Sequence, residues 1–511
     1  MKPATARSLA IGAIVALCVA SSCTGSGTDA SSGRSTTTTT PRRAVASLPA
    51  LHAERGEHPR IVDTAGRQVI LRGVNLNSLG DYYQGDPSAP TVVPVTDRDW
   101  ADMAAHGFDV VRLLVSWSSL EPERGTFDRT YLRRVHDAVD AAAAHGIYSV
   151  IDMHQDAWGA HVASPADETC PGGGDPAIGW DGAPAWATLD DGASTCTHGS
   201  RESSEAVMTD WDSFYANRDG IMDELVATWS FVATEFAGVD AVAGYDLLNE
   251  PNTGHHDTTA DLGRFYDRAI DAIRSAEATA APTPGGAGHI AFFETTVSGQ
   301  PVPTDFTTDT NIVFAPHNYG ESIGPIPIEG TFDYFRALAA GYGTAMWVGE
   351  YGFFEDTDAA EAKLTRYAAK EDALLTAGDA WWQWRQACGD PHSVGHPGGT
   401  SGPIQVHMRT NRCPGDRDGG VNPRWRCTWR AYPRFAPGVL SALASPCEGG
   451  LVAAGHTDRP GVLDVWAPGT ATTASMVTGD HLSDVHVTRA PGGVRITATV
   501  DGDYTLRVAG P

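Results

Sequence analysis

Eight short apolar runs alternate with segments of helical length between residues 60 and 430, and this alternation constrains the fold more than any other feature of the chain. The runs are rich in Val, Ile, Phe and Trp, and they span residues 69–76, 110–115, 147–153, 242–248, 290–293, 312–315, 345–348 and 380–384. Helical stretches such as 132–146, 220–238 and 360–378 end on glycines that suit helix C-caps. Eight such alternations predict an α/β fold, the (β/α)8 TIM barrel.

The pattern changes near residue 430. From there the chain alternates apolar and polar residues between turn residues, as short antiparallel strands do. We therefore predict a catalytic barrel over residues 58–430, followed by a small C-terminal antiparallel β-sandwich over 433–511. No row of aromatic residues is evident in the sandwich sequence beyond Trp466, so we expect a structural partner of the barrel rather than a separate binding module.

The N-terminus has the features of an export signal. Two basic residues precede an apolar run that is too short for a spanning helix, and small residues follow it. Cys23 after "ASS" resembles a bacterial lipobox, so we expect a lipoprotein signal over residues 1–22, lipidation of Cys23 and anchoring at the outer face of the cell membrane; ordinary signal cleavage nearby is the alternative. The Ser/Thr/Gly-rich stretch that follows cannot bury a core and predicts a tether over residues 23–57.

A formal net charge of −27 argues against nucleic acid and anionic lipid as partners, because phosphate groups require a basic surface. Apart from the N-terminal anchor we therefore expect no membrane contact, and we expect a neutral substrate and a monomer.

The cysteines of an exported protein favour disulfides. Cys170 and Cys196 lie together in one long loop region and form the most favoured pair, whereas Cys388, Cys413, Cys427 and Cys447 leave three possible pairings open. No CxxC pair is present, so the sequence does not predict a zinc site. We expect neither a metal nor an organic cofactor.

Two acidic residues stand at the ends of predicted barrel strands. Glu250 follows the fourth strand in "LLNEP" and Glu350 follows the seventh in "GEYG", so both face the barrel mouth. Two carboxylates around an open site are the groups that cleave a glycosidic bond, one as acid/base and the other as nucleophile. A lone Glu is more often a solvated ion-pair partner, but a charge after a buried strand is costly without a function.

The neighbouring polar residues fit such a site. Arg112 can keep the nucleophile ionised, His317 and Tyr319 can donate to the same carboxylate and to the sugar, and Asn249 can bond a sugar hydroxyl. The Trp cluster of the eighth strand can stack on a sugar ring, and Glu294 is either a secondary site residue or a plain ion-pair partner.

Arg112, "DMHQD", "LNEP", "HNY", "GEYG" and "WWQW", in this order, resemble glycoside hydrolase family 5 of clan A over about residues 60–430. The resemblance implies a retaining double displacement with Glu250 as acid/base and Glu350 as nucleophile. It further implies that the subsite of the glycosyl-enzyme is shaped by Arg112, His154, Asn249, His317 and Tyr319, with Trp382 or Trp384 as the platform.

Within this family, "GAPAWA", "NRDGI", "YPR" and the trailing sandwich are similar to endoglycosylceramidases, which release an intact glycan from ceramide. That resemblance implies that Asp156 and Trp186 contact the first sugar and that apolar loops hold the lipid. Relatives often carry a Lys after the first strand, whereas this chain reads "NLNSLGDYY". The length and identity of the glycan therefore stay open.

The sequence leaves three other functions open. A cellulase- or mannanase-like endoglycanase would show an open groove lined by aromatic residues, and a β-glucosidase would act on other hydrophobic aglycones. A surface lectin would bind glycans without cleaving them. Aliphatic residues along the aglycone side would instead favour a glycolipid substrate.

Overall fold

The computed structural model of the chain describes residues 48–83, 88, 90–282, 288–387, 389–391, 408–409, 420–469 and 472–510. The predicted signal, Cys23 and most of the predicted tether lie outside this part of the chain. Regular structure begins earlier than we predicted, because strand β1 (Leu51–Glu54) falls within the expected tether and pairs with β2 (Arg60–Asp63). Leu51 and Ala53 are buried on one face of β1, and these two apolar side chains are enough to attach the strand.

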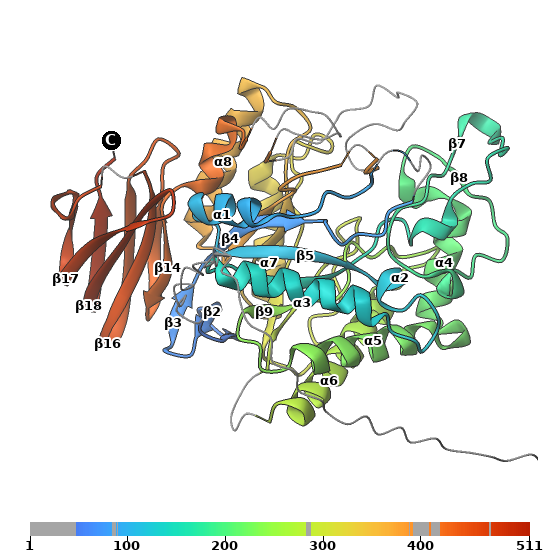
Figure 1. The fold of residues 1–511 in the computed structure, drawn as a ribbon, viewed down its shortest axis with the longest axis horizontal. Helices are drawn as coiled ribbons and strands as arrows, with labels where there is room; N and C mark the ends of the chain where they lie inside the picture. Colours follow the sequence, from blue (N-terminus) through green and yellow to red (C-terminus); the bar gives the residue numbers. More distant parts are fainter. Residues whose placement is uncertain are drawn as a thin grey trace, which may run out of the picture. The chain divides into compact units, whose positions relative to one another are not determined.

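Eight parallel strands form the central sheet (Figure 1). They are β4 (Leu71–Leu76), β5 (Val110–Ser116), β6 (Tyr148–His154), β9 (Val242–Asp246), β10 (Ile290–Phe293), β11 (Ile312–Phe314), β12 (Val348–Tyr351) and β13 (Gly378–Trp381). Their order is β11-β10-β9-β6-β5-β4-β13-β12. Parallel bridges from Phe314 to Met346 and from His317 to Glu350 join the two end strands, so the sheet closes as the TIM barrel that the sequence predicted.

Two strands differ from their predicted positions. The eighth strand was expected at residues 380–384, but β13 spans Gly378–Trp381. The seventh strand was expected at residues 345–348, but β12 spans Val348–Tyr351. Glu350 therefore lies inside this strand and not after it. The apolar run "AMWV" marks the buried approach to β12, whose own residues alternate between small, acidic and aromatic side chains.

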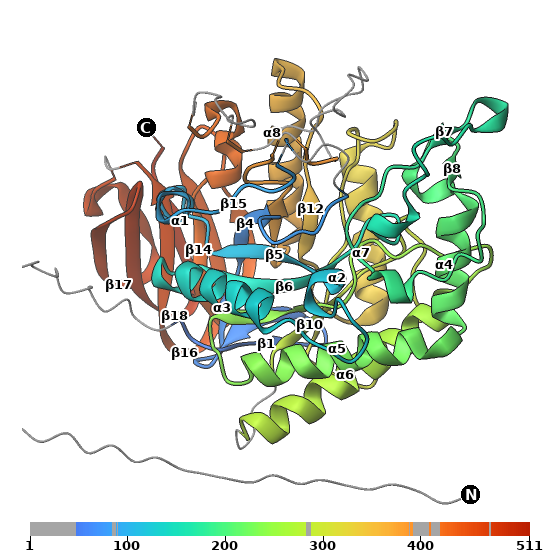
Figure 2. The same cartoon turned by 45° about the vertical axis from the view of Figure 1, so that its right-hand side comes forward.

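Helices cover the outside of the barrel (Figures 1 and 2). They are α1 (Asp97–Ala105), α2 (Trp117–Leu120), α3 (Arg129–Ala144), α4 (Glu205–Tyr215), α5 (Ile221–Phe236), α6 (Thr259–Ala280), α7 (Ile328–Tyr342) and α8 (Asp358–Leu374). Short 3-10 helices span Ala160–Val162, Pro171–Gly173, Ala185–Ala187, Arg201–Ser203, Arg218–Gly220, Pro423–Trp429 and Ala474–Met476. Gly146 (φ 76°) and Gly238 (φ 74°) follow α3 and α5 in the left-handed conformation that ends a helix, as predicted. After α8 that position is taken by Leu375 (φ 51°), while Gly378 begins β13.

The C-terminal region is antiparallel, as predicted, and consists of β14 (Tyr432–Pro437), β15 (Val439–Ala444), β16 (Leu451–Pro468), β17 (Val477–Ala490) and β18 (Gly493–Val508). The first half of the long strand β16 pairs with β15, and its second half pairs with β14 beyond a register shift. One apolar cluster includes side chains from both halves, such as Leu451 and Ala453 from the first and Leu463 and Val465 from the second. Trp466 is buried in this core, which agrees with the absence of an aromatic row on the surface.

The boundary between the barrel and the C-terminal region is not a single point in the sequence. β3 (Arg67–Val69) pairs with both β2 and β14, so strands from the N-terminal end of the chain belong to the C-terminal sheet. Residues 58–69 were assigned to the barrel because their apolar pattern runs directly into β4. The pairing partner that separates them from β4 lies more than 360 residues later, and local sequence cannot show it.

Two disulfides lie in the described part of the chain. Cys170 and Cys196 are bonded as predicted, and Cys427 pairs with Cys447, which selects one of the pairings left open. Cys388 and Cys413 lie outside the described residues. Among the helices that the structure describes, none combines the length and the apolar character needed to cross a bilayer.

Candidate active site

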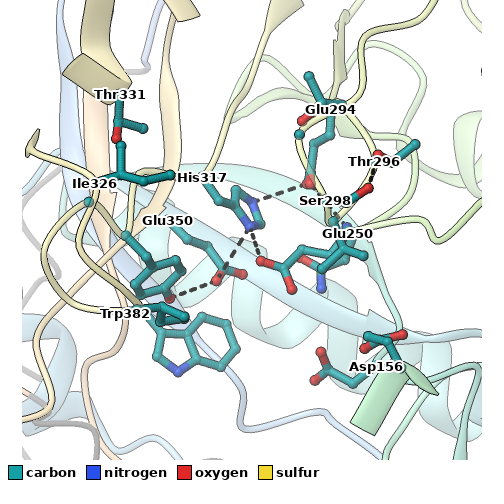
Figure 3. A pocket seen from close by; sticks show the side chains of 18 of the residues that line it. Asp156, Glu250, Glu294, Thr296, Ser298, His317, Ile326, Thr331, Glu350 and Trp382 are labelled. Carbon is teal, nitrogen blue, oxygen red and sulfur yellow. Dashed lines mark hydrogen bonds and ion pairs between the residues drawn. The ribbon is translucent and has the colours of Figure 1, made fainter. Parts of the chain in front are cut away.

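A cavity of about 630 Å³ opens where the barrel strands end at their carboxyl side. Glu250, directly after β9, and Glu350, in β12, both line it, and their side chains point toward one another across it (Figure 3). Carboxylate oxygens of Glu250 and Glu350 and a ring nitrogen of His317 all lie within 4.8 Å of one another. The two acids that the sequence singled out therefore form one site.

Glu350 is held by two donors. Arg112 Nη1 donates to Oε1 over 2.7 Å, and the Tyr319 hydroxyl donates to Oε2 over 2.9 Å. Arg112 is fully buried and also contacts Asp152 (2.9 Å), Asp246 (2.8 Å) and Glu294 (3.0 Å). Four carboxylates around one guanidinium keep it charged and fix its orientation.

Glu250 stands in a strained backbone conformation with φ of 38°. His317 Nδ1 lies 2.8 Å from Oε1, and Arg201 Nη2 donates to Oε2 over 3.2 Å. Gln155 Nε2 donates to the carbonyl oxygen of Glu250 over 3.0 Å. Asn249, the preceding residue, accepts a hydrogen bond from Arg112 Nη2 over 2.9 Å.

The pKa shifts of the two acids run opposite to our expectation for an acid/base and a nucleophile. Burial acts to raise the pKa of Glu250, but the hydrogen bond and charge of His317 and the charge of Arg201 outweigh it and lower this pKa. Burial raises the pKa of Glu350 more than His317 and Arg112 lower it. His317 causes the lowered pKa of Glu250, and its own pKa is raised well above its usual value because the surrounding carboxylates outweigh its burial. In this arrangement the proton nearest to Glu250 resides on His317, one hydrogen bond away.

Most of the predicted binding residues meet in the cavity. His154, Asp156, Asn249, His317, Tyr319 and Trp382 line it, and Arg112 lies directly behind Glu350. The ring of Trp382 is stacked on that of His154 at 5.4 Å. Of the two proposed platforms, Trp382 is therefore the one at the cavity.

Two predicted tryptophans are not cavity residues. Trp384 is buried beneath the site, and its Nε1 donates to Asp99 over 3.1 Å. Trp186 packs edge to face on Trp117 at 5.2 Å, and its Nε1 donates to the Glu121 carbonyl over 3.0 Å. Trp382 and Trp384 both follow the end of β13, so strand geometry does not fix their directions, and the loop that carries Trp186 folds against α2 instead of the cavity.

Sequence reasoning missed a group from the loop after β6. Trp180, Arg201 and Glu202 all line the cavity. The Arg201 guanidinium lies 4.5 Å from the centre of the Trp180 ring and forms ion pairs with Asp156, Glu202 and Glu250. The length of this loop and its disulfide were the available signals, but neither shows which loop side chain turns inward.

The opposite wall is apolar, and sequence reasoning named none of its residues. Val297, Ile323, Ile326, Tyr334, Phe335 and Phe354 line it. Exposed fractions are 62% for Ile323, 60% for Ile326, 44% for Tyr334 and 37% for Val297, which are unusual for large apolar side chains. The segment "ESIGPIPIEG" contained this signal, because its apolar residues match neither a strand nor a helix period.

Three clusters in the described part of the chain bring metal-binding side chains together. Cys170 and Cys196 of the first cluster are bonded to one another. In the second cluster His154 directs Nδ1 to Asp152 over 2.8 Å, and the third consists of Glu250, His317 and Glu350. A cation in the third would compete with the proton on His317 for the same carboxylates.

Comparison with known proteins places this fold and site in a family. Residues 62–387 match the cellulase family, described as glycosyl hydrolase family 5. Endoglycoceramidase I of Rhodococcus hoagii (strain 103S) is 29% identical over 279 residues, which is 51% of each chain. The chain thus spans about half the length of this relative.

Two solved structures are similar over most of the chain. A crystal structure of an endogalactoceramidase has a TM-score of 0.82 and 40% identity, and it covers 90% of this chain and 100% of its own. Endo-glycoceramidase II from Rhodococcus sp., in the form of its lactosyl-enzyme intermediate, has a TM-score of 0.66 and 25% identity, with coverages of 88% and 99%. A barrel whose mouth carries two facing carboxylates defines the glycoside hydrolase class of site. The chain belongs to glycosyl hydrolase family 5.

Proposed function

We propose that the protein is a retaining β-glycosidase that releases a sugar or oligosaccharide from a glycosphingolipid, as an endoglycosylceramidase or glycosylceramidase does. The observation that carries the proposal is a single cavity that joins two facing carboxylates, a polar wall and an apolar wall. The names of the similar proteins, endogalactoceramidase and endoglycoceramidase, support the same substrate class.

The separation of the carboxylates favours retention of configuration. Oxygens of Glu250 and Glu350 lie within 4.8 Å of one another, and retaining enzymes place the two carboxyl groups about 5–5.5 Å apart, against about 6.5–9.5 Å in inverting enzymes. An inverting mechanism needs room for a water between the second carboxylate and the sugar, and this spacing leaves little room for one.

The proposed reaction has two steps. Glu250 donates its proton to the leaving oxygen while Glu350 attacks the anomeric carbon, so that the aglycone leaves and a glycosyl-enzyme forms. Glu250 then takes a proton from water, whose oxygen displaces Glu350 and releases the sugar. His317 restores the proton on Glu250 before the first step, because it holds one 2.8 Å away.

The two walls of the cavity fit the two ends of a glycolipid. Asp156, Arg201, Glu202 and Asn249 offer polar groups to sugar hydroxyls, and Trp180 and Trp382 offer ring faces. The apolar wall with Ile323 and Ile326 fits an acyl or sphingoid chain, because it would remove exposed apolar surface from water. Aliphatic residues on the aglycone side were the feature that we expected to favour a lipid substrate, and Val297, Ile323 and Ile326 supply them beside the rings of Tyr334, Phe335 and Phe354.

An endoglucanase is the second candidate, because the matching family is named for cellulase. A cellulose or mannan chain would need stacking rings along the groove on both sides of the carboxylates. The lining residues after β11 are aliphatic at Ile323 and Ile326, and this observation favours the glycolipid.

One experiment separates these functions. The purified protein is incubated with glucosylceramide, galactosylceramide, a ganglioside and carboxymethyl cellulose, and released sugar is identified by chromatography, with proton NMR of the anomeric configuration. We expect a β-configured sugar or oligosaccharide from a glycolipid only. Release from carboxymethyl cellulose alone would establish the endoglucanase, and binding without release would establish a lectin.

We further propose that the protein is exported and held at the outer face of the bacterial membrane through lipidated Cys23. The lipobox-like sequence and the two disulfides of the described part support this location. Cells fed labelled palmitate should label the protein, and Cys23→Ala should abolish the label and release the protein into the medium. Labelling that persists in Cys23→Ala would contradict the anchor.

A further inference from the structure

A third carboxylate, Glu294, lies beside the two catalytic candidates and has no role in the reaction described above. It follows β10, is 3% exposed, and lines the same cavity. Figure 3 shows its side chain on the far side of His317 from Glu350. A buried carboxylate is costly unless its oxygens are matched by donors, so its partners indicate what it does.

Each oxygen of Glu294 has a distinct partner set. Oε2 accepts a hydrogen bond from the backbone N–H of Glu250 over 3.0 Å. Oε1 lies 3.1 Å from Nε2 of His317 and accepts from Nη2 of Arg112 over 3.0 Å. Since Nδ1 of His317 faces Glu250 Oε1, two of the three contacts lead to Glu250, one through its backbone and one through its side-chain partner.

The backbone contact holds a strained residue. Glu250 has φ of 38°, a conformation that is unfavourable for a non-glycine residue and persists only where surrounding groups fix it. Glu294 binds its N–H, and Gln155 binds its carbonyl oxygen. The position of the Glu250 carboxylate therefore depends on this pair of backbone contacts.

The contact with Arg112 is replaceable. Arg112 keeps Asp152, Asp246 and Glu350 as partners without Glu294, and these three acids hold Nε, Nη1 and Nη2. The effect of Glu294 on Glu350 through Arg112 is thus buffered, whereas its effect on Glu250 is direct.

We propose that Glu294 is a positioning residue for the acid/base step: it fixes the backbone of Glu250 and the ring of His317 so that Glu250 Oε1 receives and delivers the proton. The inference rests on the glycosidase function proposed above. The proton passes from His317 Nδ1 to Glu250 and from there to the leaving oxygen, so His317 becomes neutral and regains its proton when Glu250 is reprotonated from water.

The proposal predicts a dependence on the leaving group. Dinitrophenolate leaves without protonation, whereas phenolate and alkoxide leave only with help from a general acid. A defect in the placement of Glu250 must therefore slow poor leaving groups far more than good ones, and kcat/KM reports this first step. A defect in the nucleophile or in folding lowers both alike.

Glu294→Gln is the informative variant. The glutamine amide has one acceptor oxygen where the carboxylate has two, so either the Glu250 N–H or the donors of His317 and Arg112 lose their acceptor. We compare kcat/KM on 2,4-dinitrophenyl and phenyl β-lactosides, or on the corresponding galactosides where wild type prefers galactose. We expect a loss of about 10²-fold or more on the phenyl substrate and less than about tenfold on the dinitrophenyl substrate.

Asp246→Asn is the matched control, because Asp246 is equally buried and contacts Arg112 at 2.8 Å without touching Glu250. Asp246→Asn should lower kcat/KM on both aryl glycosides by the same factor. The ratio of the two kcat/KM values measured on one preparation does not depend on the fraction of folded enzyme. If the glutamine variant is insoluble, Glu294→Asp allows the same comparison.

Equal losses on both substrates in Glu294→Gln, or no loss, would overturn the inference. A leaving-group-dependent loss in Asp246→Asn would overturn it as well, because any disturbance of Arg112 would then suffice. A wild-type protein that cleaves neither the aryl glycosides nor the glycolipids would instead contradict the proposed function.

Discussion

Nδ1 of His317 lies 2.8 Å from Oε1 of Glu250 and 3.5 Å from Oε2 of Glu350, so one imidazole links the two acids of the site. The pKa of this imidazole is raised well above its usual value. Its charge and its hydrogen bond lower the pKa of Glu250 and so favour the ionised form of that carboxylate. Replacing His317 should therefore change how kcat/KM depends on pH.

His317→Gln removes the group that holds the proton beside Glu250, and with it the positive charge that lowers the pKa of Glu250. In wild type the basic limb of the kcat/KM profile reports loss of the proton from His317, whose pKa is raised well above its usual value. In the variant Glu250 must hold this proton itself, so we expect the limb to move to lower pH, with a lower maximum. Profiles measured from pH 4 to 10 check this, with His255→Gln as control because its partners are Asp212 and Glu205 outside the cavity. A limb that stays in place or moves to higher pH would contradict the role of His317 as the source of the proton.

Glu350→Gln removes the nucleophile and leaves the walls of the cavity intact. We expect turnover to fall by about 10⁴-fold or more while glycolipid binding persists, because binding does not require the covalent step. Calorimetry with a micellar glycolipid and a turnover assay on the same sample measure both. Unchanged turnover would identify a different nucleophile.

The apolar wall predicts a separation between lipid and soluble substrates. Ile323→Ser with Ile326→Ser should lower kcat/KM on a glycolipid by about tenfold or more, because each loses apolar contact with the aglycone. Soluble aryl glycosides should be cleaved within about twofold of wild type. Val462→Ser is the control, since Val462 is 47% exposed on β16 away from the cavity. Equal losses on both substrate types would show that the wall does not bind lipid.

The two described disulfides should differ in what they support. The pair Cys170–Cys196 closes the loop that contains Trp180 and ends shortly before Arg201, whereas Cys427–Cys447 ties the 3-10 helix Pro423–Trp429 to the chain after β15. Replacing both cysteines of the first pair by serine should mainly raise KM, with little change in the Tm. Serine at both cysteines of the second pair should lower the Tm, by an amount equivalent to about 2–4 kcal/mol, with KM unchanged. The reverse pattern would contradict the loop's role.

A buried cluster of charged residues predicts that neutral substitutions of two of its acids, Glu371 and Asp379, change the stability of the protein in different ways. Arg430 contacts Glu371 and Asp372, and Arg72 contacts Asp372 over 2.7 Å. Glu371→Gln should cost about 3–5 kcal/mol, because it leaves buried guanidinium groups with too little negative charge.

Asp379 belongs to the same cluster, beside Glu371. Burial, and then the charge of Glu371, raise the pKa of Asp379 well above its usual value. A raised pKa in the folded state stabilises the protein below the unfolded pKa, and this contribution is lost as pH rises through the folded value. Asp379→Asn cannot ionise, so it should match wild type within about 1 kcal/mol only below about pH 4, and its advantage over wild type should grow as pH rises toward the folded value. Thermal unfolding at pH 6 and pH 9.5 tests the sign, and a variant that is less stable at the higher pH would refute it.

Position in the barrel was predictable from sequence because parallel barrel strands deliver their carboxyl ends to one mouth. Arg112, Glu250 and Glu350 could be placed on that basis, and the structure brings them together. The distinction between Trp382 and Trp384 was not accessible, since both follow the end of β13 and their directions depend on the path of the chain after the strand.

Arg201 and Glu294 show the two limits of such reasoning. Arg201 reaches the cavity from a long irregular loop, whose path depends on a disulfide and on Trp180 rather than on a periodic pattern. Glu294 was visible as a strand-end carboxylate, but its partners are a backbone N–H and a histidine nitrogen that become neighbours only in three dimensions. Local pattern predicts where a strand ends, and not which donors meet there.

The pairing of β3 with β14 joins residues 67–69 to residues 435–437, the beginning of the chain to its last quarter. During synthesis β3 emerges hundreds of residues before β14 exists, so β3 can pair with β2 but its other edge stays open while the barrel is completed. The edge of β3 is therefore covered only when the whole chain has been made. A polypeptide cut short after the barrel lacks β14 and exposes the unpaired edge of β3.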